Sequence, residues 1–71
     1  MSYNRVLFSF KVKIHPTERQ IDKFFLHHGF FGVYRMDSEG IEIFITRKIR
    51  IMPDNEIIAI AERTFNEKEI K

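Results

Sequence analysis

The sequence predicts a small α+β domain whose elements follow the order β-α-β-β-α. Residues 8–14 alternate between apolar and polar side chains, as in a strand with one buried face, before Pro16 changes the period. The segment Asp37-Ser38-Glu39-Gly40 has the composition of a hairpin turn. Residues 53–65 repeat apolar side chains at helical spacing. These patterns predict a three-stranded sheet with two helices on one face, which is a ferredoxin-like plan without its last strand.

The first strand is expected over residues 5–15. One face carries Phe8, Phe10, Val12 and Ile14, and the other carries Ser9, Lys11 and Lys13. A helix over residues 17–28 follows, because Thr17 and Gln20 have the spacing of a capping box. Gly29 is expected to end this helix. Its apolar face combines Ile21, Phe24, Phe25 and His28.

The second strand is expected over residues 30–36, where Gly32 indicates a bulge or a close backbone approach. A three-residue hairpin should follow, with Gly40 at positive φ. The third strand begins at Ile41 and alternates through Ile45; it extends to residue 51 if a bulge or bend accommodates Arg47. A right-handed crossover joins the first strand to the second, and one sheet edge should stay open.

The last helix is expected to begin around Pro53, because proline and acidic residues are favoured in a first turn. In the alternative interpretation, residues 53–55 turn into a fourth strand over residues 56–61. The helix is favoured because residues 59–63 have helix-forming composition. The charged residues 66–71 are expected to fray.

Composition restricts the classes of function. The chain has 71 residues, which suits a single domain over residues 1–71, and 44% of them are hydrophobic. It has no cysteine, which excludes disulfides, thiolate zinc sites and thiol catalysis. No apolar stretch is long enough to cross a membrane, and no signal peptide is recognisable, so we expect a cytoplasmic protein. The net charge of +2 is small, and a nucleic-acid site therefore needs clustered cations.

The sheet face turned away from the helices is the leading candidate site. In a three-residue hairpin Tyr34 lies opposite Phe44, so both rings are expected to face solvent among cations. Single-stranded RNA or DNA binds such surfaces by stacking bases on rings and placing phosphates beside lysine and arginine. The residues predicted to bind nucleic acid are Lys11, Lys13, Tyr34, Phe44, Lys48 and Arg50.

This assignment depends on the register of the hairpin. A slip of one residue would place Val33 opposite Phe44 and turn Tyr34 towards the core. The segment Arg47-Lys48-Ile49-Arg50 also has two interpretations. Its cations either contact phosphates or prevent edge-to-edge aggregation of the sheet.

The alternative function is a small inhibitor or adaptor, of the phage or mobile-element type, that binds a protein partner through the open strand edge. The same edge would allow a homodimer. We expect no enzyme activity, cofactor or metal. The histidines His15, His27 and His28 lack the spacing of a metal site, and no nucleophile–base pair is recognisable. An enzyme assembled only across a dimer interface has no signature in the sequence.

Residues 10–35 are locally similar to the beginning of the transposon-encoded TnpB nucleases, relatives of type V CRISPR effectors. The similarity lies in Lys13-Ile14-His15-Pro16-Thr17-Glu18-Arg19-Gln20 and, more loosely, in residues 30–35. In that family this segment belongs to the region that binds the guide RNA. The sequence contains neither the nuclease domain nor the cysteine-rich zinc motif of the family. The resemblance therefore implies RNA contact, or mimicry of a nuclease segment by a small mobile-element or phage protein, and not cleavage.

Overall fold

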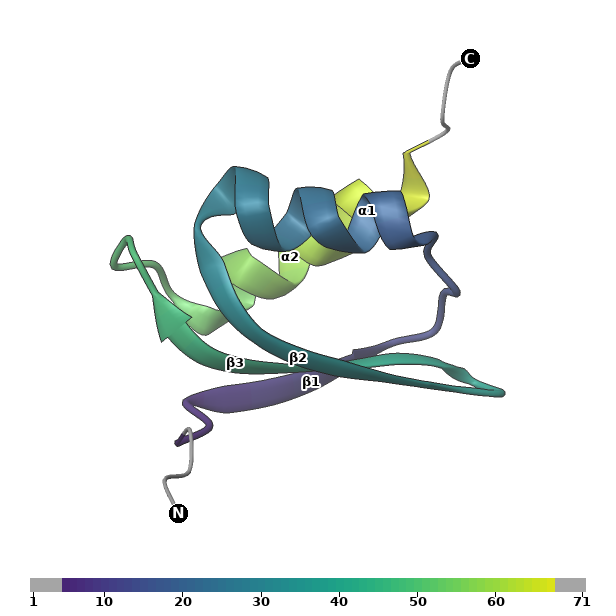
Figure 1. The fold of residues 1–71 in the computed structure, drawn as a ribbon, viewed down its shortest axis with the longest axis horizontal. Helices are drawn as coiled ribbons and strands as arrows, with labels where there is room; N and C mark the ends of the chain where they lie inside the picture. Colours follow the sequence, from purple (N-terminus) through teal and green to yellow (C-terminus); the bar gives the residue numbers. More distant parts are fainter. Residues whose placement is uncertain (1–4, 68–71) are drawn as a thin grey trace.

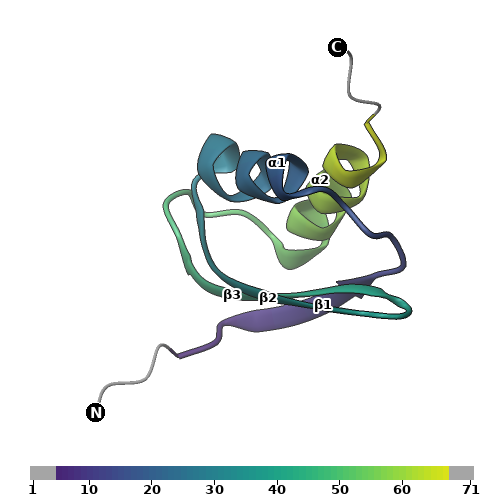
Figure 2. The same ribbon diagram turned by 45° about the vertical axis from the view of Figure 1, so that its right-hand side comes forward.

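The structure is a computed structural model that describes residues 5–67. It confirms the predicted α+β fold and the order β-α-β-β-α. Both helices cover one face of a three-stranded antiparallel sheet with strand order β1-β3-β2 (Figures 1 and 2). The elements are β1 (Phe8–Val12), α1 (Glu18–Asp22), the π-helical segment η1 (Lys23–His27), β2 (Phe30–Asp37), β3 (Gly40–Lys48) and α2 (Asp54–Asn66).

β1 places its apolar face beneath the helices, as predicted. Phe8, Phe10 and Val12 lie opposite Ile45, Ile43 and Ile41 of β3, and the three isoleucines are fully buried. The strand is shorter than the expected 5–15. Val12 pairs with Ile41, and β3 begins only one residue further on, at Gly40, so β3 offers little for β1 to pair with beyond this end.

The first helix begins as predicted but changes type partway along. Thr17 is the N-cap, and the capping box with Gln20 is complete. The predicted helix over residues 17–28 is present from Glu18, but only five residues are α-helical before η1 begins at Lys23, so its side chains do not follow the α-helical spacing expected of it. Gly29, with φ of +75°, ends the segment as expected.

The β2–β3 hairpin differs from the prediction by one residue. Asp37 pairs with Gly40, so the turn contains Ser38 and Glu39 and not three residues. Asp37 Oδ1 accepts hydrogen bonds from the backbone N–H groups of Glu39 (2.8 Å) and Gly40 (3.1 Å). Gly40 has the expected positive φ, at +152°. A shift of register between Phe31 and Gly32 confirms the irregularity predicted at Gly32.

The last helix confirms the preferred interpretation of the C-terminal half. Residues 56–61 belong to α2 and form no fourth strand. Its buried face consists of Ile57, Ile60, Ala61, Thr64 and Phe65. Asn66 is the last helical residue, and residues 68–71 lie outside the described part of the chain.

Phe24 occupies the centre of the core. It is fully buried, and its ring lies 5.1 Å from that of Phe30, 5.6 Å from that of Phe65 and 6.5 Å from that of Phe10, measured between centroids. The ring of His28 packs against Phe30 at 6.2 Å. Aromatic side chains from β1, η1, β2 and α2 therefore meet at one point.

Candidate functional site

The hairpin register separates the two aromatic residues predicted to share a binding surface. Val33 lies opposite Phe44, and Tyr34 lies opposite the buried Ile43. The expected pairing of Tyr34 with Phe44 was wrong, and the alternative register is present. The cause is the two-residue turn, because a slip of one residue exchanges the faces of a strand. Tyr34 is nevertheless 42% exposed, on the helix-covered side of an edge strand.

Lys11 shares the outer sheet face with Phe44, but its charge is already neutralised. Its Nζ lies 3.0 Å from Asp37 Oδ2 and 3.0 Å from Glu39 Oε1. The hydrogen bond to Glu39, followed by the one to Asp37, raises the pKa of Lys11. The hydrogen bond from Lys11 is the main cause that lowers the pKa of Asp37. On the same face Arg35 bonds Glu42 at 2.9 Å.

The remaining predicted cations lie elsewhere. Lys48 Nζ donates to the Met52 carbonyl at 3.0 Å and lies 5.9 Å from the centre of the Phe8 ring, on the helix-covered side. Lys13 is exposed beyond the end of β1, and Arg50 follows β3. The six predicted residues therefore do not form one surface.

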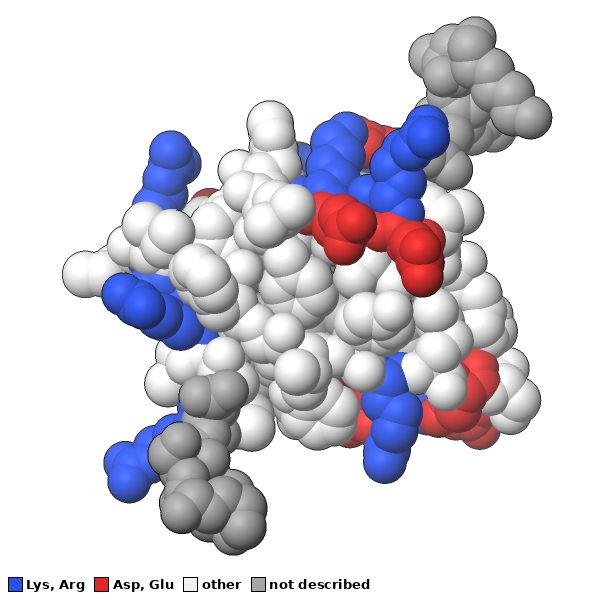
Figure 3. Space-filling view, in the orientation of Figure 1, with Lys and Arg blue, Asp and Glu red and all other residues white. Residues whose placement is uncertain are grey.

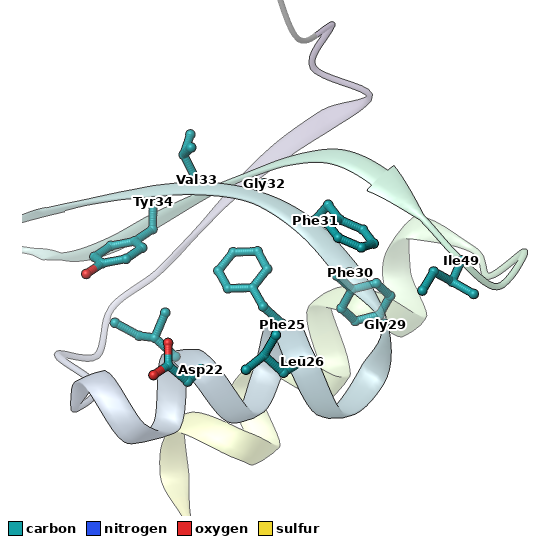
Figure 4. A pocket seen from close by; sticks show the side chains of 11 residues that line it. Asp22, Phe25, Leu26, Gly29, Phe30, Phe31, Gly32, Val33, Tyr34 and Ile49 are labelled. Atoms are coloured by element: carbon teal, nitrogen blue, oxygen red, sulfur yellow. The ribbon is translucent and has the colours of Figure 1, made fainter.

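A groove of about 570 Å³ lies between the first helix and β2. Figure 4 shows Phe25 and Leu26 on the helical side and Tyr34 on the strand side. Leu26 is 80% exposed although it is aliphatic. In Figure 3 a broad area without charged side chains occupies the middle of the face on which β2 lies in front. The residues lining the groove are Ile21, Asp22, Phe25, Leu26, Gly29, Phe30, Phe31, Gly32, Val33, Tyr34 and Ile49.

The helical wall of the groove is the π-helical segment. Such segments are rare and occur frequently at functional sites. Phe24 points into the core and Phe25 is half-buried, while Leu26 is turned to solvent. The local sequence pattern did not predict this wall. The available signal was the run Phe24-Phe25-Leu26, which has more consecutive apolar residues than one buried helical face can use.

The strand wall of the groove is an unpaired sheet edge. β2 is an outer strand of the sheet and has β3 on one side only. The Thr46 hydroxyl donates to the Phe31 carbonyl at 3.2 Å, so the backbone groups of Phe31 face β3. Because these directions alternate along a strand, the backbone groups of Gly32 and Tyr34 face the open edge.

A second hollow of about 210 Å³ continues the groove beyond Leu26, Gly29 and Ile49, which line both. Its polar lining consists of His27, His28 and Arg50. Burial is the main cause that lowers the pKa of His28, followed by the positive charges of His27, Arg63, Lys23 and Arg50. Arg50 supplies a permanent positive charge at this end of the groove.

The charges of the molecule are unevenly distributed. Figure 3 shows most of the visible acidic side chains on the right-hand half of the view, beside lysine and arginine, while the left-hand edge carries mainly lysine and arginine. At a third hollow, Arg5 and Arg47 lie beside Phe31, with the Arg47 guanidinium 5.6 Å from the centre of the ring. Two of the cationic groups, Arg5 and Arg47, thus lie together beside an exposed ring, whereas Lys11 and Arg35 on the outer sheet face are each paired with carboxylates.

Residues 5–67 form a small α+β domain with a ferredoxin-like order of elements, three strands and no fourth, and an apolar groove beside an outer strand. Comparisons with family models, curated proteins and solved structures found no match to this chain. Among residues 5–67, none of the helices combines the length and hydrophobicity needed to cross a lipid bilayer.

Proposed function

We propose that this protein is a protein-binding module that takes up an extended segment of a partner as an additional strand on β2. The observation that carries the proposal is the position of the groove. A hollow of about 570 Å³ lies directly beside a strand edge that has no neighbouring strand among residues 5–67. Strand addition of this kind obtains affinity from backbone hydrogen bonds and specificity from alternate side chains that enter pockets.

The groove offers an added strand both backbone hydrogen bonds and space for its side chains. Gly32 and Tyr34 offer backbone groups along the edge, and alternate side chains of an added strand would enter the groove beside Leu26. Burial of one Val, Leu, Ile, Phe or Met side chain contributes about 1.5–3 kcal/mol. The exposed Leu26 and Tyr34 would then be covered.

Hydrogen exchange and affinity measurements test the proposal with a pool of strand-forming peptides, in which apolar residues alternate with threonine. Binding should slow exchange of the Gly32 and Tyr34 amides and leave the Val33 amide, which faces β3, unchanged. Leu26→Lys should weaken binding about tenfold or more. Ile51→Lys is the matched control, because Ile51 is a fully exposed aliphatic residue outside the groove. Equal losses in both variants, or binding without slowed exchange at the edge, would contradict strand addition.

A second copy of the chain is the competing occupant of the same edge. Pairing of β2 with β2 of another molecule would produce the homodimer predicted from the sequence. Light scattering with and without peptide separates the two cases. A dimer that dissociates when peptide is added indicates that both compete for β2.

Nucleic-acid binding is a second candidate function, which we infer from the hollow that contains Arg5, Phe31 and Arg47. An exposed ring beside two guanidinium groups and the Thr46 hydroxyl can stack on a base and contact a phosphate. Arg47→Gln should weaken binding of a labelled single-stranded oligonucleotide. Lys11→Gln should not, because Lys11 is engaged by two carboxylates. An affinity that does not change between about 50 mM and 200 mM salt would rule out phosphate contacts.

We propose a binding role and not a catalytic one. His15 bonds the Asp37 carbonyl at 2.7 Å, and the rings of His27 and His28 contact each other at 5.1 Å. These histidines thus have partners that differ from the hydroxyl or carboxylate of a nucleophile–base pair. A cytoplasmic location stays a prediction from the sequence.

A further inference from the structure

We propose that the segment bound along β2 carries opposite charges at its two ends, with a lysine or arginine beside Asp22 and a carboxylate beside Arg50. This inference rests on the proposed strand addition and extends it to the chemistry of the partner. It is carried by the charges at the two ends of one continuous groove.

The first end of the groove is acidic. Of the described residues that line the main hollow, Asp22 alone is charged, and Figure 4 shows it near Tyr34, away from Ile49. Within residues 5–67 its carboxylate makes no hydrogen bond or ion pair. The neighbouring Lys23 is already bonded to Glu67 at 2.8 Å. An unpaired carboxylate beside apolar surface favours a ligand that brings a cation to it.

The second end of the groove is cationic. The hollow of about 210 Å³ that extends it beyond Ile49 is lined by His27, His28 and Arg50. Within residues 5–67 Arg50 has no ion-pair partner. A guanidinium binds a carboxylate through two parallel hydrogen bonds, and the adjacent imidazoles add donors. A side-chain or C-terminal carboxylate of the bound segment fits this end.

The distance between the ends sets the length of the segment. Residues 30–34 of β2 line the groove. A strand rises about 3.4 Å per residue, so the stretch from residue 30 to residue 34 is about 14 Å long. Five residues of an added strand cover that distance, so the charged residues stand at positions 1 and 7. Tyr34 lies at the Asp22 end, and an antiparallel segment therefore has its cation first and its carboxylate last.

The experiment compares two peptide pools with blocked termini. Each has five central positions in which apolar residues alternate with threonine. One pool begins with lysine and ends with glutamate, and the other has the two charges exchanged. Fluorescence anisotropy at low salt should give an affinity about tenfold higher for the lysine-first pool, since two matched pairs replace two repulsive ones. The difference should decrease at high salt.

A protein with Asp22→Lys and Arg50→Glu should reverse the preference between the pools. Both residues are exposed, so the fold should be retained, and thermal unfolding checks this. Lys13→Glu, which reverses a charge as Arg50→Glu does but at an exposed site outside the groove, should leave the preference unchanged.

The outcomes separate the charge assignment from the proposed strand addition. If the wild-type protein prefers the lysine-first pool and the double variant prefers the other, the charge assignment is supported. If the wild-type protein prefers the glutamate-first pool and the double variant reverses this, the assignment is also supported, but the bound segment is parallel to β2. Equal affinity of the wild-type protein for both pools overturns the assignment but leaves strand addition intact. If neither pool binds, the proposed strand addition fails, and the charge assignment fails with it.

Discussion

A β-carbon added to Gly32 would lie 1.9 Å from the carbonyl oxygen of Phe44. The backbones of β2 and β3 therefore approach each other here more closely than any side chain permits. This contact coincides with the shift of register between Phe31 and Gly32. Figure 4 shows Gly32 where β2 begins to bend towards the first helix, so the close approach helps to give the groove its shape.

Gly32→Ala should lower the free energy of unfolding by about 1–3 kcal/mol, because the neighbouring backbone must shift to admit the methyl group. Urea unfolding measures the change. Val33→Ala, an exposed site one residue along the same strand, serves as the control and should change stability far less. Equal effects of the two substitutions would show that the close approach is unimportant.

Gln20 links the two helices, and its replacement should reveal this. Its Oε1 accepts from the Thr17 backbone N–H at 2.9 Å, and its Nε2 donates to the Glu67 carbonyl at 2.8 Å. Gln20→Ala should reduce the free energy of unfolding by about 1–2 kcal/mol. Gln20→Glu keeps the acceptor for Thr17 but loses the donor to α2, so an intermediate loss is expected. If Glu is tolerated as well as Gln, the bond to α2 does not contribute.

The neighbouring residues Phe24 and Leu26 should respond in opposite ways. Phe24→Ala should cost about 3–5 kcal/mol, because the ring is fully buried between other aromatic side chains. Leu26→Lys should change stability by less than about 0.5 kcal/mol, because the side chain is 80% exposed. Thermal unfolding of both variants checks this. A large loss in Leu26→Lys would mean that this leucine supports the fold and is not available to a ligand.

His28 should make stability depend on pH. Burial, followed by the nearby positive charges, lowers the pKa of His28 below the ordinary 6.5. The carboxylate of Glu67 also interacts with His28, but it is bonded to Lys23. Just below pH 6.5 the unfolded chain therefore binds more protons at this residue than the folded protein does. The free energy of unfolding should fall as the pH drops through this window, and the contribution is fully present above it.

His28→Phe keeps a ring beside Phe30 and should remove this part of the pH dependence. Urea unfolding of both proteins between about pH 5 and pH 7.5 measures it. The wild-type protein should lose more stability on acidification than the variant. Parallel curves would mean that His28 titrates alike in the folded and unfolded states.

Local signals predicted most of the fold. Thr17 and Gln20 located the start of the first helix, Gly29 its end, and the spacing from Ile57 to Phe65 the face of α2. Each of these depends on residues close in sequence, whose preferences act without reference to the rest of the chain.

The candidate site depended on features that local signals do not determine. Asp37 and Gly40 suit a two-residue turn as well as a three-residue one, and the difference moved Tyr34 to the other face. Lys11 was predicted to be available, but its carboxylate partners come from the hairpin, which only the folded sheet brings close. The groove was missed because η1 departs from the α-helical spacing on which the analysis of residues 17–28 relied.

The π-helical segment gives the chain a position where its length can change. A π turn closes over five residues and an α turn over four, so deletion of one residue within 23–27 would leave an ordinary helical turn between Asp22 and His28. The side chains presented along that stretch would rotate to new directions. In β2 or β3 the same deletion would exchange buried and exposed faces. Insertions and deletions in related chains should therefore concentrate in this helix, where they diversify recognition without disturbing the sheet.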